Sequence, residues 1–294
     1  MQNEIDRSAG KPCLAAVVGG GVIGAGWVAR LIQNGVDVQV FDPDPEAPRK
    51  IEAVMANADH AIAKLPMAPM PTPGRLRFAA SIADAVAAAE LIVEAVPERL
   101  EVKHAVYAEI EAAAKPDAII SSSTSGIMPT DLQAGMRHPG RLLVGHPFNP
   151  VYLLPLVELV GGKATEANTI TRAGAYFTSI GMHPLPLAKE IEAFVADRFL
   201  EAVWREALWL VKDGIATTKE IDDAIRFGFG LRWAQMGLFE TYRVAGGEAG
   251  MAHFIAQFGP CLKWPWTKLM DVPELTGELV QTISDQSDAQ SGMH

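Results

Sequence analysis

A glycine-rich segment between residues 19 and 26 limits the fold of this chain more than any other sequence feature. It follows the apolar run Leu14 to Val18 and precedes apolar residues at helical spacing, which end at Gly35. This order predicts a strand, a tight turn and a helix. A second apolar run, Val36 to Phe41, predicts another strand after the helix stop at Gly35.

The glycine spacing in this turn is that of a dinucleotide-binding fingerprint. Gly19 makes the turn, Gly21 lets the backbone approach a pyrophosphate, and Gly24 lets helix and strand pack closely. The helix N-terminus then favours the negative phosphates. An ordinary glycine-rich turn is the alternative, but it leaves the spacing unexplained. The residues expected to contact the cofactor here are Gly19, Gly20, Gly21, Val22, Ile23 and Gly24.

Asp42 follows the second predicted strand and lies 18 positions after Gly24. In the fingerprint, an acidic residue lies about 20 positions further along the chain. A carboxylate there hydrogen-bonds the ribose 2′-hydroxyl of NAD and repels the 2′-phosphate of NADP. The sequence therefore predicts NAD as the cofactor.

Strand and helix patterns continue to alternate up to about Lys189. Helices are expected between the strands, and the prolines from Pro66 to Gly74 predict a linker without regular structure. The further strands are expected at 91–95, 118–120, 141–145 and 156–160. The predicted fold class is α/β, with a Rossmann-type, doubly wound sheet in an NAD-binding domain at 1–189. An all-helical domain for substrate binding and dimerisation is expected at 190–294, including a capping box at Thr217 to Glu220.

The composition narrows the class of protein. Hydrophobic residues make up 49% of the chain and charged residues 20%, which is enough apolar material for a folded core. No apolar run approaches the roughly 20 residues of a membrane helix, so no membrane partner is expected. The net charge of −10 disfavours nucleic acid as a partner. Two cysteines, Cys13 and Cys261, predict neither a disulfide framework nor a metal site and favour the cytoplasm.

One histidine lies at a position that suits catalysis. His146 closes a predicted strand at the sheet edge where doubly wound folds bind ligands, and Glu158 lies 12 residues on in the returning strand. If these strands pair, the carboxylate faces the imidazole, orients it and stabilises the imidazolium. Such a pair suits removal of a proton from an alcohol. The alternative is a structural histidine near an unrelated surface carboxylate.

A run of hydroxyl residues, Ser121 to Ser125, follows the predicted strand 118–120 and falls on the same sheet edge. Its hydroxyls are able to donate to a substrate oxygen. A helix-capping loop is the alternative, because Ser and Thr favour such positions.

Together, these motifs resemble the 3-hydroxyacyl-CoA dehydrogenase superfamily over about residues 14 to 270. The resemblance implies that His146 is the general base, that Glu158 orients it, and that Ser125 donates to the substrate oxygen. It also implies that Glu98 and Lys103 approach the nicotinamide and its ribose, and that the protein is a homodimer. The motifs that carry it are the glycine fingerprint, Glu94 to Glu98, Ser123 to Ser125, and His146 to Pro150 with Glu158.

Two departures from the acyl-CoA enzymes of that superfamily affect the expected substrate. Asp197 stands where the family has an asparagine, and an ionised carboxylate only accepts hydrogen bonds. The segment 47–78, where a basic arm would hold coenzyme A phosphates, is poor in basic residues and broken by prolines. A small substrate is therefore favoured over an acyl-CoA.

Two stretches, 147–158 and 232–237, resemble a small-substrate branch of the superfamily. The resemblance implies oxidation of the 3-hydroxyl of L-carnitine to 3-dehydrocarnitine. The alternatives are oxidation of L-gulonate, as in the lambda-crystallin-like members, oxidation of a short-chain 3-hydroxyacyl-CoA, and an NAD-binding protein with little turnover. Because aromatic faces hold quaternary ammonium groups well, Trp233 is the first candidate for the carnitine cation. The expected substrate-binding residues are Ser125, Phe148, Asn149, Asp197 and Trp233, and the expected catalytic residues are His146, Glu158, Ser125 and Asp197.

Overall fold

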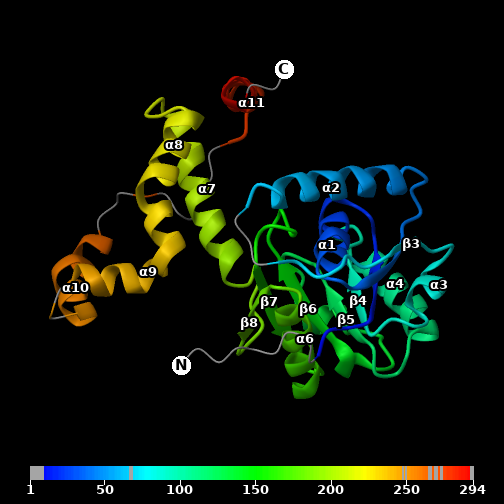
Figure 1. The fold of residues 1–294 in the computed structure, drawn as a ribbon. Helices are drawn as coiled ribbons and strands as arrows, with labels where there is room; N and C mark the ends of the chain where they lie inside the picture. The colour runs from blue at the N-terminus through cyan, green and yellow to red at the C-terminus, as the bar shows by residue number, and fades with distance from the viewer. Residues whose placement is uncertain are drawn as a thin grey trace. The chain divides into compact units, whose positions relative to one another are not determined.

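The computed structural model describes residues 10–65, 69–246, 248, 250–263, 267, 271 and 274–291. The chain divides into two compact units, Met1–Val195 and Ala196–His294 (Figure 1). The division falls six residues after Lys189, where the sequence patterns change. The first unit is α/β and the described part of the second is helical, which confirms the predicted fold class.

The first unit is built on one eight-stranded sheet with the order β3-β2-β1-β4-β5-β6-β7-β8. Neighbouring strands are parallel except for β6 and β7, which are antiparallel. The carboxyl ends of β1, β2, β4, β5 and β6 therefore share one edge, to which the amino end of β7 returns. The strands are β1 (Leu14–Val18), β2 (Asp37–Phe41), β3 (Leu76–Phe78), β4 (Leu91–Glu94), β5 (Ile119–Ser122), β6 (Leu142–Pro147), β7 (Leu156–Gly161) and β8 (His183–Leu187).

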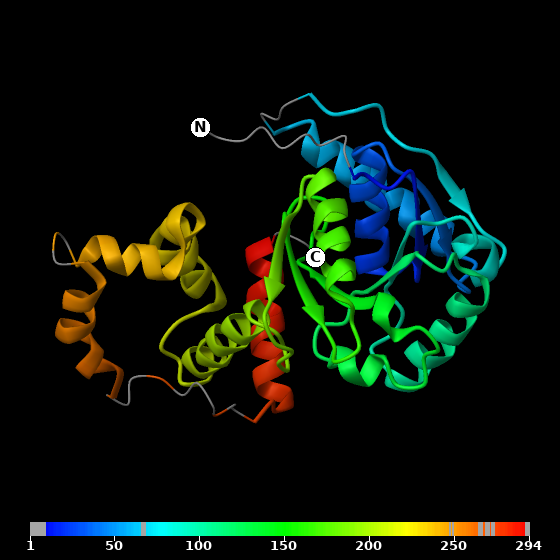
Figure 2. The same cartoon turned by 90° about the horizontal axis from the view of Figure 1, so that it is seen from below.

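Helices cover both faces of this sheet (Figure 2). Successive residues of β1 supply opposite cores, since Ala15 and Val17 belong to one and Ala16 and Val18 to the other. This is the period of two expected of a strand buried on both faces. The first core packs against α1 (Val22–Gln33), α2 (Ala47–Ile62) and α6 (Ala167–Ser179), and the second against α3 (Ile82–Val86), α4 (Leu100–Ala113) and α5 (Pro129–Leu132).

Residues 69–74 have no regular structure, as predicted for this part of the linker, but the two edge strands β3 and β8 were not predicted. β3 follows directly on the proline-rich segment, and β8 contains Pro184 and Pro186. In β8 the two prolines are two residues apart and therefore place their nitrogens on the same side of the strand. The alternate residues bond inward, as the N–H of His183 does to the Pro155 oxygen at 2.7 Å. An edge strand tolerates this pattern because its outer side has no ladder partner.

All regular structure among the described residues of the second unit is helical. The predicted capping box is confirmed: the Thr217 hydroxyl accepts from the Glu220 N–H, and the Glu220 carboxylate accepts from the Thr217 N–H. No helix in the described part of the chain has both the length and the apolarity to cross a membrane. The helices are α7 (Ala196–Lys212), α8 (Thr218–Ala224), the π-helical turn Ile225–Phe229, α9 (Gly230–Ala245), α10 (Gly250–Phe258), the 3-10 turn Gly259–Lys263 and α11 (Gly277–Ser291).

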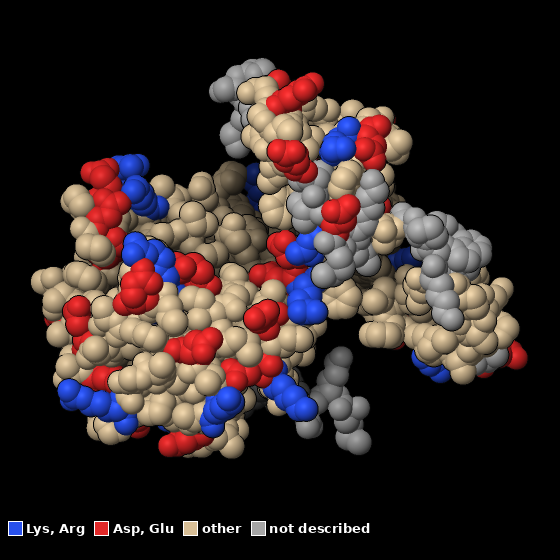
Figure 3. Space-filling view, turned by 180° about the vertical axis from the view of Figure 1, so that it is seen from behind, with Lys and Arg blue, Asp and Glu red and all other residues tan. Residues whose placement is uncertain are grey.

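Charged side chains of both signs share the molecular surface. On the face drawn in Figure 3, Lys and Arg groups are interspersed with Asp and Glu groups. Exposed ion pairs of the first unit include Lys50 with Asp44 and Arg77 with Asp84. Exposed pairs of this kind contribute little to stability, because water and salt screen the charges.

Candidate active site

The glycine-rich turn between β1 and α1 leaves no room for side chains at two positions. Gly19 has a φ of +101°, and a Cβ there would lie 2.5 Å from the Ala95 oxygen. A Cβ on Gly24 would lie 1.8 Å from the Gly19 oxygen. By contrast, a Cβ on Gly21 would meet no described atom within 4 Å, so the space in front of α1 is open. An open helix N-terminus of this kind suits a phosphate group.

Asp42 lies beside this turn, at the end of β2. One carboxylate oxygen accepts the Gly20 N–H at 2.6 Å, and the other accepts the Asp44 N–H at 2.7 Å. A mostly apolar cavity of about 600 Å³ opens next to it, between the ends of β1, β2 and β4. Apolar walls with one carboxylate suit an adenine ring and its ribose. The cavity is lined by Val18, Gly19, Gly21, Phe41, Asp42, Pro43, Ile82, Ala95, Val96, Pro97, Val102 and Val106.

His146 and Glu158 are cross-strand partners on β6 and β7. The His146 Nδ1 lies 2.9 Å from the Glu158 Oε2, and the two residues are 4% and 0% exposed. When Nδ1–H donates to the carboxylate, Nε2 is the nitrogen that accepts a proton. The structure confirms the predicted strand pairing, and the catalytic roles of the two residues stay a prediction.

Aromatic rings and a backbone amide surround this pair. The Phe148 ring lies edge-on to the imidazole at 5.2 Å, and the Phe194 ring lies 5.5 Å from it. The second Glu158 oxygen, Oε1, accepts the N–H of Val195 at 2.9 Å. Both carboxylate oxygens therefore accept hydrogen bonds, as a buried carboxylate requires.

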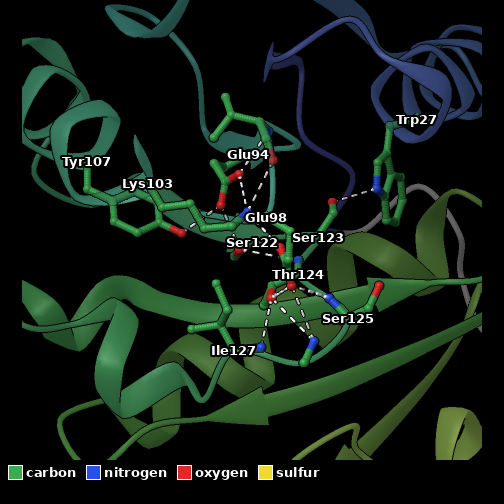
Figure 4. A network of polar contacts seen from close by, with 12 residues as sticks. Trp27, Glu94, Glu98, Lys103, Tyr107, Ser122, Ser123, Thr124, Ser125 and Ile127 are labelled. Atoms are coloured by element: carbon green, nitrogen blue, oxygen red, sulfur yellow. Dashed lines mark hydrogen bonds and ion pairs between the residues drawn. The ribbon is translucent and has the colours of Figure 1, made fainter. Parts of the chain in front are cut away.

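Ser125 lies exposed in the loop that follows β5 at the same sheet edge. Glu98 organises this loop, because its Oε1 accepts the N–H of Ser125 at 3.1 Å, the N–H of Gly126 at 3.3 Å and the Thr124 hydroxyl. Partial burial raises the pKa of Glu98, but the Thr124 hydrogen bond and the Lys103 charge outweigh burial and bring it below its usual value. Glu98 is thus held as an anion, and Figure 4 shows it in this network of polar contacts.

A buried polar network lies next to this loop (Figure 4). Glu94, with no exposed surface, accepts hydrogen bonds from the Lys103 ammonium at 2.7 Å and from the Tyr107 and Ser122 hydroxyls at 2.6 Å each. The Val96 N–H donates to the same carboxylate at 2.9 Å. Burial and the nearby Glu94 charge raise the pKa of Tyr107 well above its usual value, so its hydroxyl keeps its proton as a donor. Four donors on one carboxylate fix the ends of β4 and β5.

Lys103, expected near the cofactor ribose, lies inside this network. It is 1% exposed and lies between the Glu94 carboxylate and that of Glu98, whose Oε2 is 3.3 Å from its ammonium. Sequence reasoning gave no role of their own to Glu94, Tyr107 and Trp27, whose indole N–H donates to the Ser123 hydroxyl at 3.0 Å. An acidic residue at the end of an otherwise apolar strand was the available signal, because a buried carboxylate requires partners.

The remaining expected residues lie in the β6–β7 turn and the helical unit. Phe148 is half-buried and Asn149 exposed. Asp197 lies in the first turn of α7. Trp233, on α9, is half-buried, packs 4.7 Å from the Phe229 ring and has a buried indole nitrogen without a hydrogen-bond partner in the structure. Two further tryptophans towards the C-terminus, Trp264 and Trp266, lie outside the described residues.

Known proteins share this arrangement of domains. A family model for the 3-hydroxyacyl-CoA dehydrogenase NAD binding domain matches residues 14–191, and one for the C-terminal domain of the same enzymes matches residues 194–278. The chain belongs to the 3-hydroxyacyl-CoA dehydrogenase family. The resemblance seen in the sequence motifs is thereby confirmed, and so is the predicted NAD-binding domain. In the described residues no group of three His, Cys, Asp or Glu side chains is arranged to hold a metal ion.

Within this family, the chain is similar to curated relatives over nearly its whole length. It is 64% identical to the L-carnitine dehydrogenase of Mesorhizobium japonicum, over 94% of this chain and 76% of that protein. It is 63% identical to the L-carnitine dehydrogenase/betainyl-CoA thioesterase of Ruegeria pomeroyi, over 95% of this chain but only 58% of that protein. The chain thus spans little more than half of the two-activity relative.

A solved structure supports the same fold. The NAD⁺-dependent 5-formyl-3-hydroxy-2-methylpyridine 4-carboxylic acid 5-dehydrogenase matches with a TM-score of 0.81 and 27% identity. The match covers 95% of this chain and 94% of that one. By its name, that protein acts on a small pyridine carboxylic acid.

Proposed function

We propose that this chain oxidises the 3-hydroxyl of L-carnitine to 3-dehydrocarnitine with NAD as hydride acceptor. The observation that carries the proposal is the 64% identity to an L-carnitine dehydrogenase over 94% of this chain. The buried His146–Glu158 pair at the ligand edge of the sheet supports an alcohol oxidation, because such a reaction requires a base for the hydroxyl proton.

In this proposal His146 Nε2 accepts the hydroxyl proton as the hydride leaves C3. Glu158 stabilises the imidazolium that forms and holds the ring in the tautomer with Nδ1 protonated. Ser125 donates a hydrogen bond to the reacting oxygen. Its loop is held by Glu98, which limits the freedom of that donor. NAD supplies the nicotinamide ring that takes up the hydride.

For the cofactor, we assign the pyrophosphate to the N-terminus of α1. Gly20, Gly21, Val22 and Ile23 lie there with the open space beyond Gly21. Asp42 is assigned to the ribose hydroxyls. Glu98 and Lys103 act near the nicotinamide end, and since Lys103 is buried against two carboxylates, its contribution is to hold Glu98 in place.

For the substrate, Phe148 and Asn149 are assigned to the carnitine chain, and Trp233 to its trimethylammonium group. A quaternary ammonium has no hydrogen to donate, so an aromatic face is its natural partner. Asp197 adds negative charge that favours the cation. Replacing the family asparagine by an acid in this way also disfavours a substrate with acidic groups at that point.

The proposed assembly is a homodimer formed through the helical unit. The described helices carry large apolar side chains that are strongly exposed, including Phe199 at 58%, Trp204 at 59% and Phe239 at 73%. Apolar surface on this scale marks an interaction site. We place the enzyme in the cytoplasm, where the exposed thiol of Cys13 stays reduced.

The test is a substrate panel. The purified protein is mixed with NAD and, in turn, with L-carnitine, L-gulonate and 3-hydroxybutyryl-CoA, and the absorbance of the reduced nicotinamide is followed. The expected result is the highest kcat/KM with L-carnitine. A higher kcat/KM with either of the other substrates would replace carnitine as the proposed substrate, and no reduction with any of the three would contradict the proposal.

A further inference from the structure

The segment Glu190–Val195, here called the strap, leads from β8 to the start of α7. Its first residue is anchored to α5. The Glu190 carboxylate accepts the backbone N–H of Thr130 at 3.0 Å and the Thr130 hydroxyl at 2.6 Å. Because α5 follows the Ser125 loop closely in the chain, one end of the strap is tied to the element next to the proposed oxygen donor.

The other end of the strap is anchored to the proposed base and its partner. Phe194 has no exposed surface and packs 5.5 Å from the His146 ring. The next N–H, that of Val195, donates to the Glu158 Oε1 at 2.9 Å, while the Glu158 Oε2 faces His146 Nδ1. The Val195 amide therefore selects which carboxylate oxygen faces the imidazole.

The strap backbone takes a conformation that is unfavourable for residues with side chains. Ala193 and Phe194 have φ values of +57° and +50°, and both lie in the left-handed region. Two consecutive residues persist there only when the surrounding contacts hold them. The buried Phe194 ring and the Val195–Glu158 hydrogen bond are contacts of that kind.

We propose that the strap is a positioning element of the active site, in which Phe194 and the Val195 amide hold Glu158 and His146 in their productive orientation. Neither residue has a part in the proton or hydride transfer itself. The expected effect of the strap on kcat rests on the proposed function. Small misplacements of catalytic groups are costly, since a displacement of about 1 Å lowers rates by roughly 100-fold.

The kinetic test is the substitution F194L, which replaces the ring that packs on His146 by a smaller branched side chain. We expect kcat to fall by about 10- to 100-fold, with little change in the KM for NAD. The matched control is I110V, a similar loss of volume at a fully buried residue of the same core on α4. It is expected to lower Tm as F194L does but to leave kcat within about twofold.

A double-mutant cycle separates positioning from packing. If Phe194 acts through Glu158, F194L adds little to the loss of kcat already caused by E158Q, because the carboxylate that it positions is gone. Losses that multiply in the double variant would mean that Phe194 acts independently of Glu158, which overturns the proposal.

A spectroscopic test needs no substrate. A proton shared between His146 Nδ1 and Glu158 gives a downfield ¹H NMR resonance, assigned by its loss in H146Q. F194L is expected to shift or broaden this resonance, and I110V to leave it in place. If F194L does not fold, E190Q at the other anchor carries the same measurements. If F194L leaves the resonance unmoved, the strap proposal is overturned. The same holds for E190Q where it replaces an unfolded F194L. A moved resonance in a protein inactive on carnitine overturns only the proposed function.

Discussion

The two units cover their apolar side chains in different ways. In the first unit the central strands are buried, and Ala15 to Val18 are at most 1% exposed. In the second unit, among the residues that the structure describes, only Leu208 and Leu279 are buried hydrophobics. Phe227 and Phe239 are each 73% exposed there, and Leu262 is 89% exposed.

This difference suggests that the first unit positions catalytic groups and that the second unit forms an interface. The first unit has complete cores on both faces of its sheet, and a close-packed interior holds side chains such as His146 and Glu158 rigidly. The helical unit has apolar surface that its own described residues leave uncovered, which suits burial against a second copy. The proton and hydride transfers are thus expected to depend on the rigid first unit, and the stability of the second unit is expected to depend on assembly.

The largest effect is expected at the base in the sealed unit. Replacing His146 by Gln removes the proposed proton acceptor, so kcat should fall by roughly 10²- to 10⁴-fold. The affinity for NAD should stay nearly unchanged, because the glycine turn and Asp42 are untouched. Steady-state kinetics and NAD titration measure the two quantities. A kcat within threefold of the unmodified enzyme would remove His146 from the mechanism.

The assembly of the helical unit is tested by F239E. Burying one phenylalanine side chain stabilises by about 1.5–3 kcal/mol. A two-fold interface contains each residue twice, so a glutamate there should weaken dimerisation by roughly 10²- to 10⁴-fold. Sedimentation velocity over a range of concentrations measures this. An unmodified protein that is monomeric throughout, or a variant that dimerises equally well, would contradict the assignment of this surface.

Recognition of the cation is tested by W233A. Contact between an aromatic face and a desolvated cation contributes about 2 kcal/mol, so the KM for carnitine should rise roughly 30-fold while NAD affinity stays constant. The neutral carbon analogue 3-hydroxy-5,5-dimethylhexanoate isolates the charge. The unmodified enzyme should prefer carnitine, and W233A should lose much of that preference. Equal activity of the unmodified enzyme on both compounds would refute recognition through the charge.

The smallest effect is expected from Glu98. Its pKa lies below the usual 4.5 in the folded protein, so its charged form stabilises the fold above that pH and this contribution disappears as the pH falls through the folded value. E98Q should lower Tm at pH 7 by a few degrees at most, since 1 kcal/mol shifts Tm by about 2–4 °C in a domain of this size. The gap should shrink at pH 4. A gap that is constant with pH would show that the charge contributes nothing.

Much of the first unit was predictable from local sequence signals. The glycine turn demands particular residues because Gly19 and Gly24 have no space for a side chain. The pairing of His146 with Glu158 was also predictable, because one turn joins their strands and sets the register. β8 was missed because prolines disfavour a strand in the centre of a sheet but are tolerated at its edge, and β3 was missed because it is only three residues long.

Contacts between distant parts of the chain were beyond the reach of such signals. The Val195 amide meets Glu158 across 37 residues, and Glu98 meets the Ser125 amide across 27. Neither partner has a residue type that suggests the other, since one member of each pair is a backbone group common to every position. In the helical unit, helical periodicity identified the apolar faces but could not say whether the chain or a second copy covers them.

The two backbone amides on Asp42 have a consequence for cofactor exchange. A side chain ordered during folding loses little rotamer freedom on binding, a loss that otherwise costs about 0.5–1.5 kcal/mol. The same restraint makes the carboxylate a fixed obstacle, because rotating it away from a 2′-phosphate breaks its bond to Gly20 inside the phosphate-binding turn. The preference for NAD over NADP and the geometry of the phosphate-binding turn therefore depend on the same Asp42 carboxylate. Engineering this enzyme toward NADP requires a new support for Gly20 as well as a new residue at position 42.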